Sequence, residues 1–337
     1  MMKGLNSSRR NNACEPAGAS LTPEAKLFVI ALRCGRLANR LVLSANFIAL
    51  AEEQGHRLVN FAFHSYSHLF EGTRNDIYCQ YPPPARQGFL EAVPGAAWLL
   101  RKSRILYHAT RGASRLNELC PVFGKRVLTL REPGGGKITL LEGPEFQAQI
   151  VPARLIFAYG WRFRAPGWVR KHAGKIRACF QPVPDIEQGC RRIADDLRRR
   201  AEVVVGVHIR QGDYRAWKQG RYFFPASRYA GWMREMSDRV SPRRVAFYVC
   251  SDEARTSAEF EGLDVGLGGD SPAQDLYTLA RCDYVIGPPS TFSQWASFYG
   301  DKPLFHLRDT NAPLDLGQFR VSDLGDIPGD AFPPDYI

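Results

Sequence analysis

The sequence has no apolar run long enough to cross a membrane. A spanning helix needs about 20 consecutive apolar residues, and no stretch of the 337-residue chain approaches that length. Behind the adjacent Arg9 and Arg10 there is no apolar segment of the kind that a signal peptide requires. We therefore expect residues 1–24 to be a disordered tail and the protein to be cytoplasmic.

Closely spaced cysteines and a D-x-D motif are also missing. The nearest two of the eight cysteines, Cys179 and Cys190, are eleven positions apart, so no C-x-x-C metal or redox pair exists. Buried free thiols in a reducing compartment explain them better than disulfides. No D-x-D pair is present, and His64 and His68 lack a third ligand nearby. The sequence therefore predicts neither a metal site nor a bound cofactor.

The composition is that of a globular, basic protein. Hydrophobic residues make up 45% and charged residues 23% of the chain, which excludes a mostly disordered or coiled-coil protein. The 45 Lys and Arg against 34 Asp and Glu give a net charge of +11. Such a charge favours anionic partners: a nucleotide diphosphate, nucleic acid, or peripheral contact with an anionic membrane.

Two regions show alternating strand and helix patterns. The first is a β-α-β unit, with strands at 26–33 and 57–63 around a helix at 39–55. The second begins with a helix near Ile186 and continues with strands at 203–210, 243–250, 283–287 and 303–307, separated by helices at 225–240, 253–260, 272–281 and 291–300. Between the two regions, the sequence predicts a helix at 96–102 and strands at 104–110 and 126–132.

These patterns predict an α/β protein with two doubly wound domains. We expect a first domain over residues 25–184, a second over 185–320, and a tail over 321–337. The first helix of the second domain has a basic face formed by Arg191, Arg192 and arginines 198–200. We expect a solvated face rather than a membrane or nucleic-acid contact, because Asp195 and Asp196 interrupt the basic residues.

The most specific motif, H-I-R-Q-G-D-Y, follows the apolar strand at 203–210. In a parallel sheet this end of the strand faces the ligand crevice. Arg210 offers a forked donor suited to phosphate, and Asp213 can hold the loop or the arginine. The competing interpretation is a simple turn at Gly212 and Asp213, with Arg210 in solvent; composition alone does not separate the two.

Two further segments have similar features. Asp275 precedes a strand that is followed by Ser290, Thr291 and Phe292 at a helix start. Hydroxyl residues there are ordinary N-caps, yet a helix N-terminus after a strand is also an anion site. The segment Cys34 to Arg40 links strand to helix in the first domain, where it could close over the same ligand.

These three segments, in this order, resemble motifs of the fucosyltransferase superfamily, which includes α-1,2- and α-1,6-fucosyltransferases and protein O-fucosyltransferases. The motif at 208–214 is similar to H-x-R-x-G-D, residues 35–41 to G-x-L-G-N-Q-L, and residues 275–295 to the late segment that ends in S-(S/T)-F-S-x-W. The resemblance implies a GT-B-like fold of two Rossmann-type domains facing across a cleft.

The resemblance also implies a function and roles for residues. It implies inverting, metal-independent transfer of L-fucose from GDP-β-L-fucose to a hydroxyl of a glycan or glycolipid, in α-1,2 or a related linkage. Arg210 would bind the β-phosphate, and Asp213 is a candidate base or, more favoured, a loop-fixing residue. The remaining expected donor-binding residues are His208 and Asp275 on the guanine side, Ser290, Thr291 and Phe292 at the pyrophosphate and sugar, and Gly35 and Asn39 in the facing loop.

Three departures from the family pattern bear on the linkage. Gln211 stands where the α-1,2 pattern has a second arginine, Ala38 where it has glycine, and Arg40 where it has glutamine. A non-catalytic GDP-sugar-binding or lectin-like relative remains an alternative. A nucleic-acid-binding protein is a weaker one, suggested by aromatic residues among basic ones at Tyr214, Trp217, Tyr222 and Phe223. It explains the charge but not the three motifs, so no nucleic-acid partner is expected.

Overall fold

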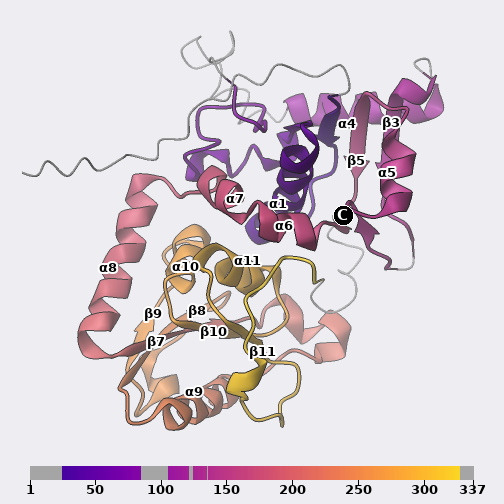
Figure 1. The fold of residues 1–337 in the computed structure, drawn as a ribbon. Helices are drawn as coiled ribbons and strands as arrows, with labels where there is room; N and C mark the ends of the chain where they lie inside the picture. Colours follow the sequence, from indigo (N-terminus) through magenta and orange to yellow (C-terminus); the bar gives the residue numbers. More distant parts are fainter. Residues whose placement is uncertain (1–24, 85–104, 121–123, 135, 327–337) are drawn as a thin grey trace, which may run out of the picture.

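Two α/β units lie one above the other in the computed structural model, which describes residues 25–84, 105–120, 124–134 and 136–326 (Figure 1). The tail expected over 1–24, the helix expected over 96–102 and residues 327–337 of the expected C-terminal tail lie outside the described residues. Among the residues described, no helix is long and apolar enough to cross a bilayer.

The first unit contains a parallel sheet of order β2-β1-β5-β3. Its strands are β1 (Leu27–Ile30), β2 (Arg57–Val59), β3 (Val127–Arg131) and β5 (Leu155–Tyr159), and β4 (Thr139–Leu140) pairs separately with β6 (Phe163–Arg164). Its helices are α1 (Leu37–Gln54), α4 (Ile105–Leu119), α5 (Pro144–Ile150), α6 (Pro166–Lys171) and α7 (Ala173–Cys179).

One of the two strands expected in the middle of the chain is confirmed and one is wrong. Strand β3 lies within the expected 126–132, whereas residues 105–110 of the other expected strand begin helix α4. A short apolar run does not distinguish strand from helix. The helical spacing emerges only over a longer window, in which Tyr107, Thr110 and Ser114 face inward.

The second unit contains a parallel sheet of order β11-β10-β7-β8-β9. Its strands are β7 (Val203–Ile209), β8 (Val245–Ser251), β9 (Val265–Leu267), β10 (Tyr284–Gly287) and β11 (Leu304–His306), and its helices are α8 (Pro184–Arg200), α9 (Ala226–Val240), α10 (Pro272–Leu279) and α11 (Thr291–Gly300). The helix expected over 253–260 is only a 3-10 turn at Ser257–Phe260, because a capping box between Thr256 and Glu259 starts the turn late.

The order of the second sheet creates a topological switch point. The chain adds β8 and β9 on one side of β7, then returns to add β10 and β11 on the other side. Loops leaving β7 and β10 therefore diverge at the carboxyl edge of the sheet, where such folds bind ligands. Both motifs of the second unit, at Arg210 and at Ser290, leave from these two strands.

Helix α1 joins the two units. Every residue from Leu37 to Ala51 is buried, since the helix packs against α6 and α7 on one side and against α11 of the second unit on another. A helix that is apolar around most of its circumference is stable only inside such a core. Side chains of both units consequently belong to one continuous hydrophobic cluster, including Leu41 and Phe47 from the first unit and Trp295 from the second.

The arginines at the end of α8 form the expected solvated face. Arg198 pairs with Asp283, Arg199 with Asp196, and Arg200 with Asp196 and Asp264. The run is therefore part of an ion-paired surface of the second unit.

Helix α11 ends against α10 with no room for a side chain. A Cβ built on Gly300 would lie 1.9 Å from the carbonyl oxygen of Ala280. We expect Gly300→Ala to lower the free energy of unfolding by about 1–3 kcal/mol, as overpacking against fixed backbone does. Chemical denaturation measures this change. The matched control is Gly112→Ala in α4, where a Cβ meets nothing within 4 Å; it should raise stability by about 0.5–1 kcal/mol. Equal effects of both substitutions would contradict the close packing.

Candidate functional site

Arg210 leaves the end of β7 held by two carboxylates. Its Nε and Nη2 donate to the two oxygens of Asp213 at 2.8 and 2.9 Å, and Nε lies 3.6 Å from Asp252. Burial opposes the charge, but the hydrogen bonds and charge of Asp213 raise the pKa of Arg210 above its usual value. The guanidinium is therefore a fixed cation, and Asp213 uses both oxygens to orient it.

Asp252 is a residue that the sequence motifs missed. It follows β8, the strand beside β7, and one of its oxygens accepts the backbone N–H of Gln211 at 2.8 Å. The available signal was its place directly after a buried parallel strand. Its two contacts fix the loop that carries Arg210.

Gln211 points away from the pocket into the base of this loop. Its amide donates to the carbonyl of Phe224 at 2.6 Å and accepts from Arg255 at 2.5 Å. The side chain is 4% exposed and does not line the cavity. In this chain the departure at Gln211 therefore acts on loop structure, while Arg210 remains the cation that the loop presents to the pocket.

The N-terminus of α11 forms the next wall of the site. Ser290 is the N-cap, and its hydroxyl accepts the N–H of Phe292 at 3.2 Å. The Tyr214 hydroxyl donates to the carbonyl of Pro289 at 2.5 Å and so ties the Arg210 loop to this helix start. A helix N-terminus carries unpaired N–H groups and a partial positive charge, so two anion-suited features meet here.

The rings of His208 and Phe292 pack against each other in the wall of the cavity that also contains Arg210. Their rings are 4.8 Å apart, and Nδ1 of His208 forms a 2.9 Å hydrogen bond with the hydroxyl of Ser293. Burial, followed by the nearby charge of Arg210, lowers the pKa of His208 to about 3. The imidazole is therefore neutral at physiological pH and does not serve as a cation for phosphate.

Asp275 lies at the far end of the cavity. Its carboxylate accepts the Tyr248 hydroxyl at 2.7 Å and the N–H of Gly269 at 3.0 Å. Burial raises the pKa of Asp275 in spite of these two hydrogen bonds. A partly desolvated acceptor of this kind suits a ligand that donates N–H groups.

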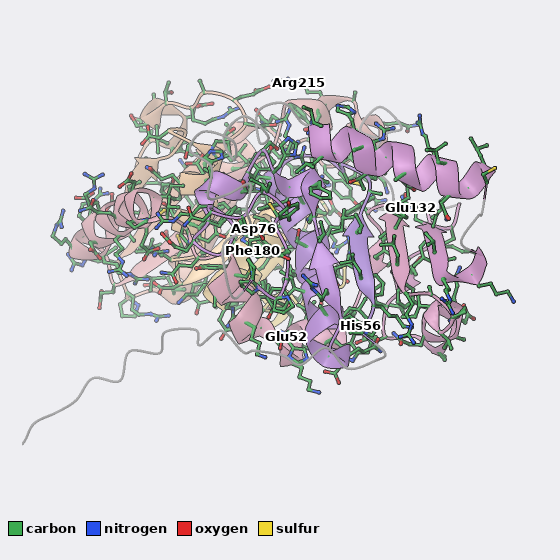
Figure 2. All side chains as sticks on the ribbon, turned by 90° about the horizontal axis from the view of Figure 1, so that it is seen from above. Glu52, His56, Asp76, Glu132, Phe180 and Arg215 are labelled. Atoms are coloured by element: carbon green, nitrogen blue, oxygen red, sulfur yellow. The ribbon has the colours of Figure 1, made fainter. Side chains whose placement is uncertain are left out.

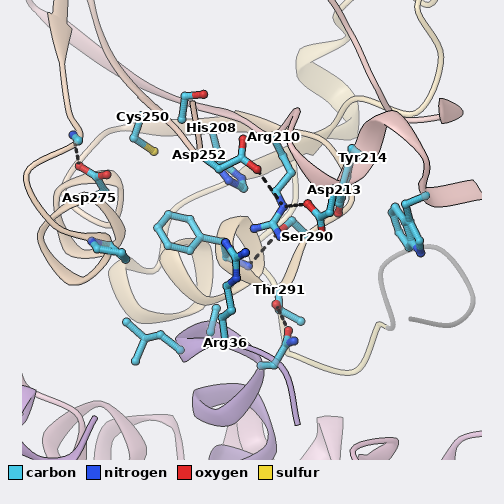
Figure 3. Close-up of a pocket in the computed structure, with 18 of the residues that line it drawn as sticks. Arg36, His208, Arg210, Asp213, Tyr214, Cys250, Asp252, Asp275, Ser290 and Thr291 are labelled. Atoms are coloured by element: carbon cyan, nitrogen blue, oxygen red, sulfur yellow. Dashed lines mark hydrogen bonds and ion pairs between the residues drawn. The ribbon is translucent and has the colours of Figure 1, made fainter. Parts of the chain in front are cut away.

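The first unit closes the site with the start of α1. Gly35 has a φ of +57°, and a Cβ there would collide with the Asn39 side chain at 1.8 Å. Asn39 in turn forms a hydrogen bond with the hydroxyl of Thr291, which directly joins the two units. Arg36 is exposed and lines the cavity, and Figure 3 shows it reaching from α1 toward Arg210.

These parts enclose a cavity of about 350 Å³ between the two units (Figure 3). Eight of the nine residues expected at the site line it: Asn39, His208, Arg210, Asp213, Asp275, Ser290, Thr291 and Phe292. The ninth, Gly35, lies just outside the lining and shapes the loop. Lining residues that the motif comparison did not assign include Arg36, Tyr66, Cys250, Ser251, Asp252 and Pro272.

Arg40, another departure from the family pattern, is a buried clamp beneath this loop. Its Nε and Nη2 donate to the carbonyl of Gly35 at 3.2 and 3.1 Å. Nη1 donates to the carbonyl of Ala62 at 3.0 Å and to Ser65 Oγ at 2.8 Å. The guanidinium also lies 4.9 Å from the ring centre of Tyr66, which lines the cavity. Arg40 therefore holds two segments of the first unit at the mouth of the site.

Three of the four aromatic residues after Arg210 pack on one another, and the fourth, Phe223, lies against Arg215. Trp217 lies 4.6 Å from Tyr214 and 5.5 Å from Tyr222, and both tyrosines are buried. A platform for single-stranded nucleic acid needs exposed rings. The rings of Tyr214 and Tyr222 are therefore not available for stacking with nucleic-acid bases. Among the described residues, no group of three or more His, Cys, Asp or Glu side chains could hold a metal ion.

The Arg40 contacts lead to a stability prediction. Arg40→Gln removes the hydrogen bonds to Ala62 and Ser65 and the contact with Tyr66, so the free energy of unfolding should fall by about 1–3 kcal/mol. Urea denaturation gives this value. Arg57→Gln is the control, because Arg57 is an exposed arginine of the same unit with one hydrogen bond to Gln80; it should change stability by less than about 0.5 kcal/mol. An Arg40→Gln protein as stable as the parent would show that the clamp is not needed.

Comparison with known proteins finds similarity in the part of the chain that carries Arg210, Asp275 and Ser290. Residues 184–313 match the family described as Glycosyl transferase family 11. Over 123 residues the chain is 30% identical to galactoside alpha-(1,2)-fucosyltransferase 1 of Saimiri sciureus, covering 34% of this chain and 33% of that protein. It is also 30% identical to galactoside 2-alpha-L-fucosyltransferase Sec1 of Mus musculus, covering 32% of each. The chain thus spans about a third of the length of these curated relatives.

A solved structure extends the similarity to both units at the level of fold. A variant of Arabidopsis thaliana FUT1 in complex with GDP aligns with a TM-score of 0.50 and 14% identity, covering 89% of this chain and 75% of that one. The expected GT-B-like fold is confirmed. Residues 184–313, which contain the motifs at Arg210 and Ser290, are therefore similar to glycosyl transferase family 11, and both units share the fold of the FUT1 variant.

Proposed function

We propose that this protein is a glycosyltransferase that moves L-fucose from GDP-β-L-fucose to a hydroxyl group of a glycan or glycolipid, in an α-1,2 or related linkage, with inversion and without a metal ion. The observation that carries the proposal is the cavity at the switch point of the second unit. A fixed arginine, a helix N-terminus and a second arginine from the first unit converge there. We infer the donor and the inversion from the similarity of residues 184–313 to glycosyl transferase family 11 and to galactoside fucosyltransferases.

The charges of the cavity suit a diphosphate. Asp213 occupies Nε and Nη2 of Arg210, and Nη1 has no hydrogen bond to another described residue. Arg36 adds a second cation from α1, and the start of α11 adds the backbone N–H of Thr291 and the partial positive charge of a helix N-terminus. We propose that the pyrophosphate lies among these groups. The guanine base then points toward Asp275, whose carboxylate accepts its N–H groups.

The reaction needs stabilisation of the leaving group. When the bond between fucose and phosphate breaks, negative charge develops on the departing GDP. Preorganised donors stabilise that charge without rearranging during the reaction. Arg210 is preorganised by Asp213 and Asp252, and Asn39 holds Thr291 in place across the cleft. We therefore assign Arg210 to transition-state stabilisation and Asp213 to positioning Arg210 rather than to removing the acceptor proton.

The two arginines and the helix N-terminus stabilise the negative charge that a divalent cation stabilises in metal-dependent transferases. The positive charge that faces the diphosphate comes from the protein itself. Metal independence therefore follows from the proposed roles of Arg36 and Arg210, and we expect chelators to have no effect.

The first test measures donor choice and metal dependence together. GDP and GDP-fucose should raise the melting temperature, since a ligand that binds only the folded state stabilises it. UDP-sugars should not. GDP-fucose should also be hydrolysed slowly to GDP, at the same rate with and without EDTA. Stabilisation by UDP-sugars alone would contradict the donor assignment, and activity that requires added Mn²⁺ or Mg²⁺ would contradict the metal-independent mechanism. Binding of GDP-fucose without turnover would favour the non-catalytic alternative.

The second test removes the fork of Arg210 but keeps its charge. In Arg210→Lys all the donors are on one nitrogen, so the side chain cannot hold both oxygens of Asp213 in a planar fork while a separate nitrogen faces the phosphate. The kcat for release of GDP should fall on the order of 10²-fold or more, and kcat/KM should fall with it. Arg199→Lys is the control, because Arg199 lies on the exposed face of α8 and pairs only with Asp196. Unchanged turnover in a folded Arg210→Lys protein would refute the role of Arg210.

A further inference from the structure

Helix α4 exposes an apolar face that nothing in the proposed reaction uses. Its inward face is formed by Tyr107, Thr110 and Ser114, all buried. On the outward face, Ile105, Leu116 and Leu119 are 58%, 66% and 81% exposed. Large apolar side chains exposed to this degree and gathered on one element mark an interaction surface.

The spacing of these residues makes the face continuous. Ile105, Ala109, Gly112, Leu116 and Leu119 follow one another at intervals of four, three, four and three residues, and this spacing places them on one side of a helix. We call these five residues the outer stripe. None of them is charged, and all five are exposed. In Figure 2, which views the molecule from above, α4 runs along the upper right edge.

Basic side chains border the outer stripe on one side. His108 and Arg115 are exposed and follow the stripe along the helix, and Lys125 and Arg126 are exposed in the next turn of the chain. The single acidic residue of α4, Glu118, is bound to Arg131 of β3 at 2.6 and 2.7 Å. Within the described parts of α4 and that turn, no free carboxylate offsets the basic residues.

We propose that α4 is a membrane-contacting helix that lies flat on an anionic lipid surface, with the outer stripe inserted between headgroups and the basic residues against lipid phosphates. An interfacial helix needs an apolar face bordered by Lys or Arg, and α4 has both. Charge complementarity favours lipid over a second copy of the chain. Pairing two α4 helices would bring Arg115 toward its equivalent, and Glu118, the acidic residue of α4, is already bound to Arg131.

Helix α4 also connects this surface to the site. The backbone N–H of Arg33, two residues before Gly35, donates to the Tyr107 hydroxyl at 3.1 Å. In Figure 1, α4 lies in the part of the first unit that is distant from helices α8 to α11. A protein docked through α4 would therefore keep the second unit clear of the bilayer.

Vesicle co-sedimentation of the full chain tests the proposal. The probe is a set of vesicles of phosphatidylcholine with about 30% phosphatidylglycerol, compared with phosphatidylcholine alone, because anionic headgroups attract basic residues at the surface. The parent protein should bind the anionic vesicles more strongly, and high salt should weaken that binding. The double variant Leu116→Gln/Leu119→Gln should lower the partition coefficient about tenfold or more. Arg115→Gln should lower it about fivefold at low salt.

Matched variants separate a specific surface from general stickiness. Val151→Gln removes an apolar side chain that is 70% exposed on the same unit but outside α4, and it should bind as the parent does. Leu119→Gln alone keeps the test available if the double variant unfolds, since Leu119 is the most exposed of the three large side chains of the stripe. The proposal fails if the parent does not bind anionic vesicles, if the stripe variants bind as the parent does, or if Val151→Gln weakens binding equally. It also fails if sedimentation velocity shows a dimer that the double variant dissociates without any vesicle binding. None of these outcomes depends on the proposed transfer of fucose.

Discussion

The burial of α1 between two sheets is the constraint on which the rest of the structure depends. Its residues from Leu37 to Ala51 are buried, because the helix packs on α6 and α7 of the first unit and on α11 of the second. A helix with so little polar surface is stable only where both neighbours are present. The start of this helix supplies Arg36 and Asn39 to the cavity. The cleft therefore rests on a shared core.

The site combines strong local order with contacts between distant segments. Arg210 and Asp213 are three residues apart and form a fork pair within one loop. Asp252, from the neighbouring strand, fixes that loop through the backbone of Gln211. Tyr214 then ties it to the turn before α11. Each contact reduces the freedom of the guanidinium, and a donor fixed before the reaction stabilises developing charge better than one that must reorient.

Two of the departures from the family pattern are explained by the same network. Gln211 turns inward to join Phe224 and Arg255, so it stabilises the base of the Arg210 loop. Arg40 uses all three guanidinium nitrogens to join the Gly35 loop to Ala62 and Ser65. From the sequence alone, the departures at Gln211 and Arg40 bear on the linkage that the enzyme would form. In the folded chain, both make internal contacts that support the loops on either side of the cavity.

The sequence by itself determined the α/β class, most elements of the second unit, and eight of the residues that line the cavity, because buried strands and strand-to-helix links leave local patterns. It did not determine α4, because the seven residues at 104–110 have the apolar pattern of a strand when considered alone. Nor did it determine the 3-10 turn at Ser257–Phe260, which depends on the capping box of Thr256 and Glu259. Only the tertiary structure decided that Asp252 and Arg36 join the site and that Asp213 is engaged by Arg210. Strand order and packing between the units bring these groups together, and neither property is encoded in the spacing of residues along one segment.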